Sequence, residues 1–535
     1  MTTQIAITEN KINWSGQQLA IFDWFATPQQ SAALVVMARA GTGKTTSIVE
    51  ALNRCSASDR RILACAFNKT IERELTARIT DKRVTVKTLH GAGYGVMIRA
   101  WGYPESDGAR GTRIAREICG ATAVDDAVTM VAALASIAKG TMPFLGVDRK
   151  CYGDDLADLT SLAEEFGHVP DEAMARAGWD CGAIVKAALE CMRAACRKDA
   201  GLAIREDGSK GKTCVDFDDM TYLPVRLGLA RATYDLTVVD EAQDMSPTQI
   251  LLAQALTYSA GRMVYVGDSE QAIYSWRGAD VNVLSRVVED FGATVLPLNI
   301  THRCPKSVVA LAAQIVPDFT AADDAPDGIV DSLATPALLL ATAKPGDAIL
   351  SRKNAPLADL CLALLRNGVR ARIEGRDIGA ALCGLARKVA GRAVASMTME
   401  TFSERLGKWA DRRIAKLTES AIKRGDVRLS DEGVSAIVDQ RDTLLALAED
   451  VDTVSELCDK VSMLFSNAED RTGQPPCVVL SSIHKAKGKE WGRVFVLVGA
   501  LRNGGEEDRL RYVAYTRAKS HLTLCQGFES KRSVE

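Results

Sequence analysis

The sequence lacks any stretch of the roughly twenty apolar residues that a membrane-spanning helix needs. Its N-terminus, MTTQIAITENKINW, also lacks the basic start and apolar run of a signal peptide. It shows no internal repeat and no low-complexity linker. We therefore expect no membrane association and a cytoplasmic protein, in a bacterial cytoplasm or, if the source is viral, in that of the host.

The fourteen cysteines show no regular spacing. Cys191 and Cys196 come closest to a metal-binding pair, but they are too far apart for a zinc knuckle and have no second pair. We expect buried free thiols in a reducing compartment, with a zinc site as the less favoured alternative. The formal net charge of −2 neither supports nor excludes a nucleic-acid partner, because a basic channel can lie on a neutral protein.

Short apolar runs alternate with turns and helical patterns along the 535 residues. This alternation is typical of α/β proteins with parallel sheets. The runs form two groups that divide near residue 295, which indicates two α/β cores. Helix-rich stretches at 91–230 and 380–470 interrupt these cores. The expected strands are 32–38, 61–67, 236–242, 262–268, 347–352, 477–483 and 493–500.

The segment VVMARAGTGKTTSIVEAL places a strand, a glycine turn and a helix in succession. Such a Walker A turn points backbone N–H groups at phosphates and adds a lysine for their charge and a hydroxyl for Mg²⁺. Ala38 stands where the full pattern has its first glycine. The alternative is a chance Gly-Lys-Thr at a helix start. The predicted nucleotide-binding residues are Ala40, Gly41, Thr42, Gly43, Lys44, Thr45 and Thr46, with Lys44 also catalytic and Thr45 a Mg²⁺ ligand.

A second motif, VVDEAQD, delivers Asp240 and Glu241 to the end of an apolar strand. This pattern is typical of a Walker B motif, in which one carboxylate holds Mg²⁺ and the other orients the attacking water. The alternative is an acidic loop that caps a strand. Together with the lysine turn, the motif predicts a site of NTP hydrolysis.

Beyond these two motifs, the chain resembles the UvrD/Rep-type branch of superfamily 1 DNA helicases, as a compact, phage-like member. The resemblance rests on DEAQD and GDSEQAIYSWRGAD and extends over most of the chain in the family's order. The other similar motifs are WSGQQLAIF, AFNKTIERELTARI, TLHGAGY, VDFDDM, LNITHRCPKSVV, SSIHKAKGKEWGRVFV and EEDRLRYVAYTRAKSHL.

The resemblance implies an α/β fold with two RecA-like parallel-sheet cores and helix-rich inserted subdomains. The expected parts are 1–90, the first core with Walker A; 91–214, a helical insertion; 215–295, the first core continued with Walker B and the aromatic motif; 296–380, the second core; 381–470, a short second helical insertion; and 471–535, the C-terminal part of the second core.

The resemblance also implies roles around the nucleotide. His302 stands where the family has an adenine-stacking tyrosine, and Thr46 where many relatives have an arginine. The implied nucleotide-binding or catalytic residues are Gln17, which reads adenine, Asp268, Gln271, which senses the γ-phosphate, His302, the arginine fingers Arg303 and Arg517, and Glu490.

The stretch VYVGDSEQAIYSWRGAD, residues 264–280, is implied to join the nucleotide site to the DNA site. An indole ring is a stacking platform for any base. The alternative is that Tyr274 and Trp276 are core aromatics. Ser482 replaces a threonine of the family. The implied DNA-binding residues are Asn68, Thr88, His90, Tyr274, Trp276, Arg277, Arg352, Ser482 and His484.

The implied function is an ATP-dependent DNA helicase or translocase that moves 3′→5′ on single-stranded DNA. It would couple ATP hydrolysis with Mg²⁺ to duplex unwinding in replication, recombination or repair, with single-stranded DNA and DNA junctions as partners. One alternative is a translocase that strips proteins from DNA and unwinds little. Another is a non-catalytic scaffold on a RecA-like fold, against which the intact Lys44, Asp240 and Glu241 argue.

Overall fold

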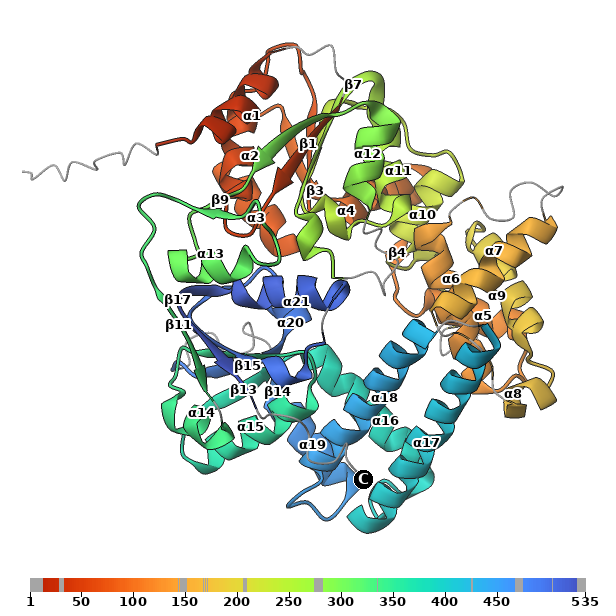
Figure 1. The fold of residues 1–535 in the computed structure, drawn as a ribbon. Coiled ribbons are helices and arrows are strands. Elements are labelled where there is room, and N and C mark those ends of the chain that lie inside the picture. Colours follow the sequence, from red (N-terminus) through yellow and green to blue (C-terminus); the bar gives the residue numbers. More distant parts are fainter. Residues whose placement is uncertain are drawn as a thin grey trace, which may run out of the picture.

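Two parallel sheets and two helical parts make up the fold (Figure 1). The first sheet lies at the top of the view, the second below it, and the helical parts lie on the right. The computed structural model describes residues 13–27, 33–142, 144, 152–166, 168, 170, 172–204, 209–273, 282–333, 335–424, 427–466, 475–502 and 504–526. Within these ranges, no helix has the length and apolar character required to cross a membrane.

The first sheet has six parallel strands in the order β3-β2-β6-β7-β1-β8. Alternate side chains of β1 enter two separate cores: Val35 packs on one face, and Leu34 and Val36 pack on the other. Both faces are therefore covered, as is usual for parallel sheets. The strands are β1 (Ala33–Ala38), β2 (Ile62–Ala66), β3 (Val84–Thr88), β6 (Tyr234–Val239), β7 (Thr257–Gly267) and β8 (Thr294–Leu298).

Helices cover the two faces of this sheet. One face contacts α1 and α2, and the other contacts α4, α11 and α12. Ser15 begins α1 with a reciprocal capping box to Gln18, which fixes where that helix starts. The helices are α1 (Gly16–Ala26), α2 (Lys44–Asn53), α3 (Lys69–Arg78), α4 (Leu89–Met97), α10 (Asp219–Arg226), α11 (Pro247–Leu256) and α12 (Val283–Phe291).

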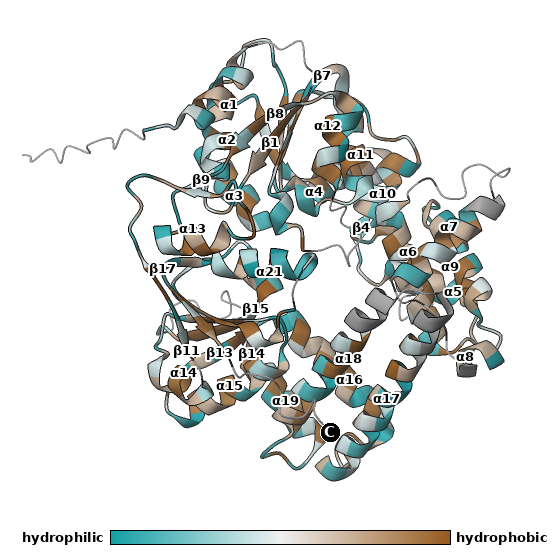
Figure 2. Ribbon diagram, in the orientation of Figure 1, coloured by the Kyte–Doolittle hydropathy of each residue, from teal (hydrophilic) through white to brown (hydrophobic). Residues whose placement is uncertain are grey.

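The second sheet has seven parallel strands in the order β11-β17-β16-β12-β15-β13-β14. Its central strands are mostly hydrophobic, as the brown ribbons of Figure 2 show. The strands are β11 (Ile329–Leu333), β12 (Ala348–Ser351), β13 (Ala371–Glu374), β14 (Phe465–Ser466), β15 (Val478–Ser482), β16 (Trp491–Leu497) and β17 (Ala518–Cys525). Its helices include α13 (Lys306–Ala312), α14 (Pro336–Thr342), α15 (Ala355–Arg366), α20 (Ile483–Ala486) and α21 (Glu506–Tyr515).

All seven strands expected from the sequence are present, and the expected α/β class with two parallel-sheet cores is confirmed. Other strands of the two sheets were not expected, among them β3, β8, β13 and β17. β8 pairs with β1 and ends at Leu298. The first sheet therefore continues past residue 295, where we expected the cores to divide.

The first helical part follows α4 and returns to the sheet at α10. It begins with a short π-helix, Ile98–Gly102, and encloses its own apolar core. The two strands β4 (Glu105–Ser106) and β5 (Cys214–Val215) pair at its base. Its helices are α5 (Arg110–Cys119), α6 (Asp125–Thr141), α7 (Tyr152–Glu165), α8 (Glu172–Arg176) and α9 (Cys181–Ala195).

The second helical part consists of α16 (Arg376–Ala390), α17 (Met399–Arg424), α18 (Val427–Leu447) and α19 (Val454–Leu464). Its apolar side chains join the core on one face of the second sheet, so it is anchored there. Lys388 of α16 also forms an ion pair with Asp126 of α6, at 2.5 Å, which links the two helical parts. The division into these domains remains our proposal, except that the first core extends past residue 295 to include β8.

Helices α4 and α10 cross at Gly93. A Cβ atom added at Gly93 would overlap the carbonyl oxygen of Met220, so only glycine allows this approach. The contact matters because α4 carries Thr88 and His90 at its N-terminus, next to the segment before α10.

We predict that Gly93→Ala lowers stability by about 1–3 kcal/mol, because the backbone of Met220 cannot yield to the added methyl group. Gly95→Ala is the matched control on the same helix, since its nearest neighbour is the end of the flexible Lys87 side chain at 3.8 Å. Thermal melting measures both. Equal melting temperatures for the two variants would contradict the close crossing.

Candidate nucleotide and DNA site

The Walker A turn follows β1 and leads directly into α2. Gly41 and Gly43 have φ angles of 70° and 78°, in the left-handed region that glycine adopts without strain. Lys44 and Thr45 form the first turn of α2, so the lysine and the hydroxyl lie at a helix N-terminus that favours anions. Thr42 is buried and donates to the carbonyl of Arg39 at 2.9 Å, which closes the turn.

Lys44 pairs with Glu241 at 3.3 Å. Burial alone would lower the pKa of Lys44, but the carboxylates of Glu241, Asp268 and Asp240 outweigh it and raise that pKa. The lysine is therefore held as a cation among three acidic groups. These groups come from the ends of β7, which pairs with β1, and of β6, the next strand beyond β7 in the sheet.

The two Walker B carboxylates differ in environment. Burial and the charge of Glu241 raise the pKa of Asp240, although Lys44 opposes this. For Glu241, burial is outweighed by Lys44 and Lys487, which lower its pKa. Glu241 also adopts a left-handed backbone, with φ 52°, an uncommon and strained conformation for a glutamate. The pair thus offers one ionised carboxylate at a fixed position beside a second that a cation would stabilise as an anion.

Gln243, which the sequence reasoning missed, holds Glu241 in place. Its amide Nε2 donates to Glu241 Oε2 at 2.5 Å, and its Oε1 accepts from the backbone N–H of Asp268 at 3.1 Å. Gln243 is fully buried. The Gln243 side chain therefore links Glu241 to the end of β7. The glutamine in DEAQD was the sequence signal for this residue.

Gln271 lies between the two cores. Its Nε2 donates to Asp268 Oδ2 at 2.6 Å, and its Oε1 accepts from Arg517 Nη2 at 3.4 Å. Arg517 belongs to the second core and is buried. Burial and the charge of nearby Arg303 lower the pKa of Arg517 to about 10. The expected γ-phosphate sensor and one expected finger thus contact each other directly.

Arg303 packs against the Walker A turn. A Cβ atom at Gly41 would lie 2.5 Å from Arg303 Cβ, and the N–H of His302 donates to the carbonyl of Gly41 at 2.9 Å. The Arg303 guanidinium pairs with Glu490 at 2.5 Å. The structure therefore brings both expected fingers and Glu490 close to the turn.

Lys487 is a further residue that the sequence reasoning missed, although it lies in the quoted segment SSIHKAKGKEWGRVFV. Its Nζ contacts Asp244 Oδ2 at 2.6 Å and the carbonyl of Gln271 at 2.5 Å. Lys487 comes from the second core and Asp244 from the first. The side chains are 8% and 1% exposed, so this ion pair is shielded from water.

The residues expected around the adenine have different partners. Gln17 exchanges two hydrogen bonds with Asn299, at 2.6 and 3.1 Å, and its amide is thereby oriented. His302 is exposed. At Thr46, the guanidinium of Arg78 from α3 donates to the hydroxyl at 2.9 Å. A guanidinium thus lies beside position 46 although that residue is a threonine.

Three of the expected DNA-binding residues are helix N-caps. Asn68 caps α3, Thr88 caps α4 and Ser482 caps α20, each by accepting a backbone N–H with its side-chain oxygen. Thr88 and Ser482 are the last residues of the parallel strands β3 and β15, and Asn68 lies two residues after the end of β2. Free N–H groups at such junctions suit phosphate contacts. Arg352 pairs with Glu507 at 3.0 Å, and His484 lies in α20.

His90 stacks on Phe217, with ring centroids 3.8 Å apart and an angle of 22° between the planes. Phe217 is 61% exposed, so the pair presents an aromatic face to solvent. The sequence reasoning did not single out Phe217, although an aromatic residue among the acids of VDFDDM was a signal. Tyr274, Trp276 and Arg277 lie outside the described residues.

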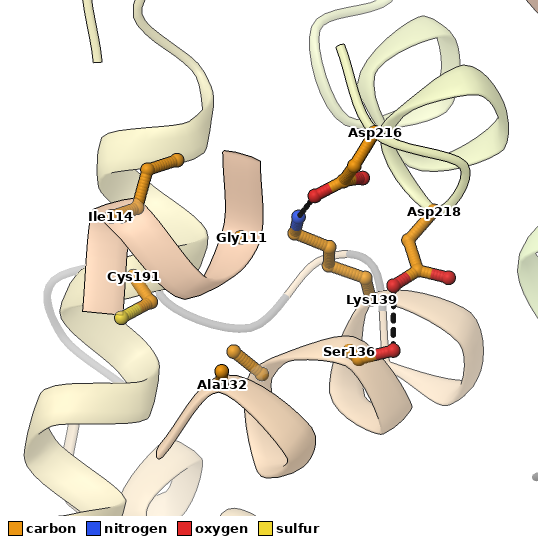
Figure 3. Close-up of a pocket in the computed structure, with 9 residues that line it drawn as sticks. Gly111, Ile114, Ala132, Ser136, Lys139, Cys191, Asp216 and Asp218 are labelled. Atoms are coloured by element: carbon orange, nitrogen blue, oxygen red, sulfur yellow. Dashed lines mark hydrogen bonds and ion pairs between the residues drawn. The ribbon is translucent and has the colours of Figure 1, made fainter. Parts of the chain in front are cut away.

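A buried ionic cluster anchors the segment that carries Phe217 (Figure 3). Lys139 contacts Asp216 at 3.3 Å and Asp219 at 2.8 Å, and Asp219 also pairs with Arg110. Ser136 donates to Asp218 at 2.5 Å. The acids on both sides of Phe217 are thus fixed by the first helical part, while the ring between them is exposed and stacks on His90.

Two RecA-like cores whose Walker A turn meets arginines of the opposite core define the class of nucleotide-driven motor enzymes. Two family models match the chain: the UvrD/REP helicase N-terminal domain over residues 23–292, half of the chain, and the UvrD-like helicase C-terminal domain over residues 477–525. The chain belongs to the UvrD/REP helicase family, and it is an ATP-hydrolysing DNA helicase.

Named relatives agree with this assignment. The ATP-dependent DNA helicase UvrD2 of Mycobacterium bovis is 27% identical over 573 aligned residues, which cover 91% of this chain and 76% of the relative. A probable DNA helicase II homolog of Rickettsia conorii is 36% identical over 84 residues, 16% of this chain and 13% of the relative. The ATP-dependent DNA helicase PcrA of Bacillus subtilis is 31% identical over 111 residues, 19% and 15% of the two chains.

Arg303→Ala and Arg517→Ala should each lower kcat by roughly 10³-fold or more. The same variants should weaken ATP binding far less. The reason is that their charge matters chiefly in the transition state, when both cores meet the γ-phosphate. Steady-state hydrolysis with saturating DNA and nucleotide titrations separate the two effects. Arg511→Ala, on α21, is the matched control. A finger variant with normal turnover would remove that residue from the site.

His90 should make stability depend on pH. Burial lowers its pKa to about 4, whereas an unfolded histidine titrates near about 6.5. Between these two pKa values only the unfolded chain binds the proton, so protonation favours unfolding. The contribution of neutral His90 to the free energy of unfolding is therefore complete above the unfolded pKa and is lost as the pH falls toward the folded pKa. Melting temperatures between about pH 7.5 and pH 5 should therefore fall more steeply for the wild type than for His90→Gln. Parallel curves would contradict this assignment.

Proposed function

We propose that this helicase moves 3′→5′ along single-stranded DNA by opening and closing its two cores around ATP. The direction follows the family resemblance, and the observation that carries the opening and closing of the cores is their direct contact at Gln271, through Arg517 and through Lys487. A group that reports on the γ-phosphate is thus held by the opposite core. Gln271 therefore connects ATP hydrolysis to the movement of the two cores.

On the nucleotide side, Lys44 neutralises phosphate charge and Glu241 orients the attacking water. The ion pair with Lys44 and the amide of Gln243 hold Glu241 ionised at a fixed position, which suits a group that must accept a proton. Arg303 and Arg517 approach the γ-phosphate from the second core. Gln17, with its amide oriented by Asn299, supplies hydrogen bonds for the adenine.

Asp240 and Thr45 fit a magnesium ion. Asp240 is buried, its pKa is raised by burial and by Glu241, and Lys44 pairs with Glu241 rather than with Asp240. A cation would stabilise the ionised form of such a carboxylate. Mg²⁺ prefers oxygen ligands, and one carboxylate with one hydroxyl would leave its other coordination positions open to phosphate oxygens. When bound, the ion would supply charge neutralisation for the phosphates, and Asp240 and Thr45 would hold it.

On the DNA side, the N-caps of α3, α4 and α20 and their free N–H groups hold phosphates. The His90–Phe217 pair, together with Trp276, supplies ring faces for stacked bases, each worth about 1–3 kcal/mol. Phosphates and ring faces carry almost no sequence information, so binding is independent of sequence. Because contacts come from both cores, closing the interface around ATP shifts one core along the strand.

This activity serves replication, recombination or repair, on single strands and on DNA junctions. The described cysteines are all free thiols, which supports a reducing compartment such as the cytoplasm.

A strand-displacement assay tests the direction. Duplexes with a 3′ tail should be unwound, and those with a 5′ tail or blunt ends should not, because the enzyme loads on a single strand and moves 3′→5′. ATP hydrolysis with and without single strands is measured beside it, and Lys44→Ala is the inactive control.

Preference for the 5′ tail would reverse the proposed direction. DNA-stimulated hydrolysis without strand displacement on any substrate would instead favour a translocase that strips proteins from DNA.

A further inference from the structure

The hydroxyl of Tyr512 crosses from the second core to the first. Tyr512 lies in α21 and is fully buried. Its hydroxyl accepts the backbone N–H of Ala40 in the Walker A turn at 2.9 Å and donates to Asp268 Oδ2 at 3.3 Å. One atom of the second core is therefore bonded to both the turn and the end of β7.

Asp268 receives four donors in all. Oδ2 accepts from Tyr512 and from Gln271 Nε2, and Oδ1 accepts from Arg39 Nη1 at 3.2 Å and from the N–H of Glu270 at 3.1 Å. The carboxylate is completely buried, so an unfilled lone pair there would have no water to replace the donor. Losing the Tyr512 hydroxyl therefore changes the group that orients Gln271.

The ring of Tyr512 is fixed independently of its hydroxyl. Phe319 packs edge-on against it, with centroids 5.5 Å apart. Arg517, two residues beyond the end of α21, donates to Gln271 Oε1 at 3.4 Å. The C-terminal half of α21 and the residue beyond its end thus deliver two contacts to the Gln271–Asp268 pair, and both exist only when the cores are together.

We infer that Tyr512 is a positioning residue for ATP hydrolysis. Its hydroxyl binds the closed second core to the Walker A turn and fixes Asp268, so that Gln271 and Arg517 are aligned at the γ-phosphate when the cores close. The inference rests on the proposed function of this site. Tyr512 acts through Asp268 and is not itself a catalytic residue.

Tyr512→Phe tests this role because it keeps the ring and removes only the hydroxyl. We expect about a tenfold lower kcat with saturating DNA, the size of one lost hydrogen bond to a charged group, with a smaller change in the KM for ATP and only a modest fall in melting temperature. Tyr515→Phe is the matched control, since Tyr515 is also buried on α21. It should turn over like the wild type.

A double-mutant cycle with Asp268→Asn separates positioning from packing. If Tyr512 acts through the carboxylate, Tyr512→Phe costs less in the Asp268→Asn background than in the wild type. If the effects of Tyr512→Phe and Asp268→Asn on kcat simply multiply in the double variant, the inference is overturned. A Tyr512→Phe variant that melts much earlier and loses binding and turnover together, or one that equals the wild type, would also overturn it. Failure of the proposed function looks different, because the wild type itself would then fail to displace strands from 3′-tailed duplexes, whatever Tyr512→Phe does to ATP hydrolysis.

Discussion

Parallel strand pairing is the constraint on which the site depends. In a parallel sheet every strand ends at the same edge, where the next helix begins. In the first sheet β6, β7 and β1 are neighbours. Asp240 follows β6, Asp268 follows β7 and the turn with Lys44 follows β1, so residues nearly 200 positions apart meet without any special loop. The ion pair of Lys44 with Glu241 follows from that order.

Much of this could be predicted from the sequence. The seven expected strands were short, largely apolar runs, and such runs are a strong signal because both faces of a parallel sheet are buried. The Walker A turn could also be predicted, because glycines, a lysine and a hydroxyl residue between a strand and a helix rarely occur except at a phosphate site. Family motifs then indicated which arginines to look for in the second core.

The rest depends on contacts between distant residues. β13 was missed because Arg372 and Glu374 are buried in it as an ion pair and break its apolar pattern. Phe217 became notable only through its stacking on His90. Likewise, the partners of Gln243 and Lys487 depend on which strand ends are neighbours. Local patterns carry no information on that order, so the cross-core contacts could not be predicted.

The ionic cluster of Arg110, Lys139, Asp216 and Asp219 has a consequence for how the sequence can change over time. Replacing one member leaves a buried charge without its partner, at a cost of several kcal/mol, whereas replacing the whole set with apolar residues can be tolerated. Residues on α5, on α6 and before α10 are therefore expected to be inherited as one unit. Homologous sequences should keep all four or lose all four.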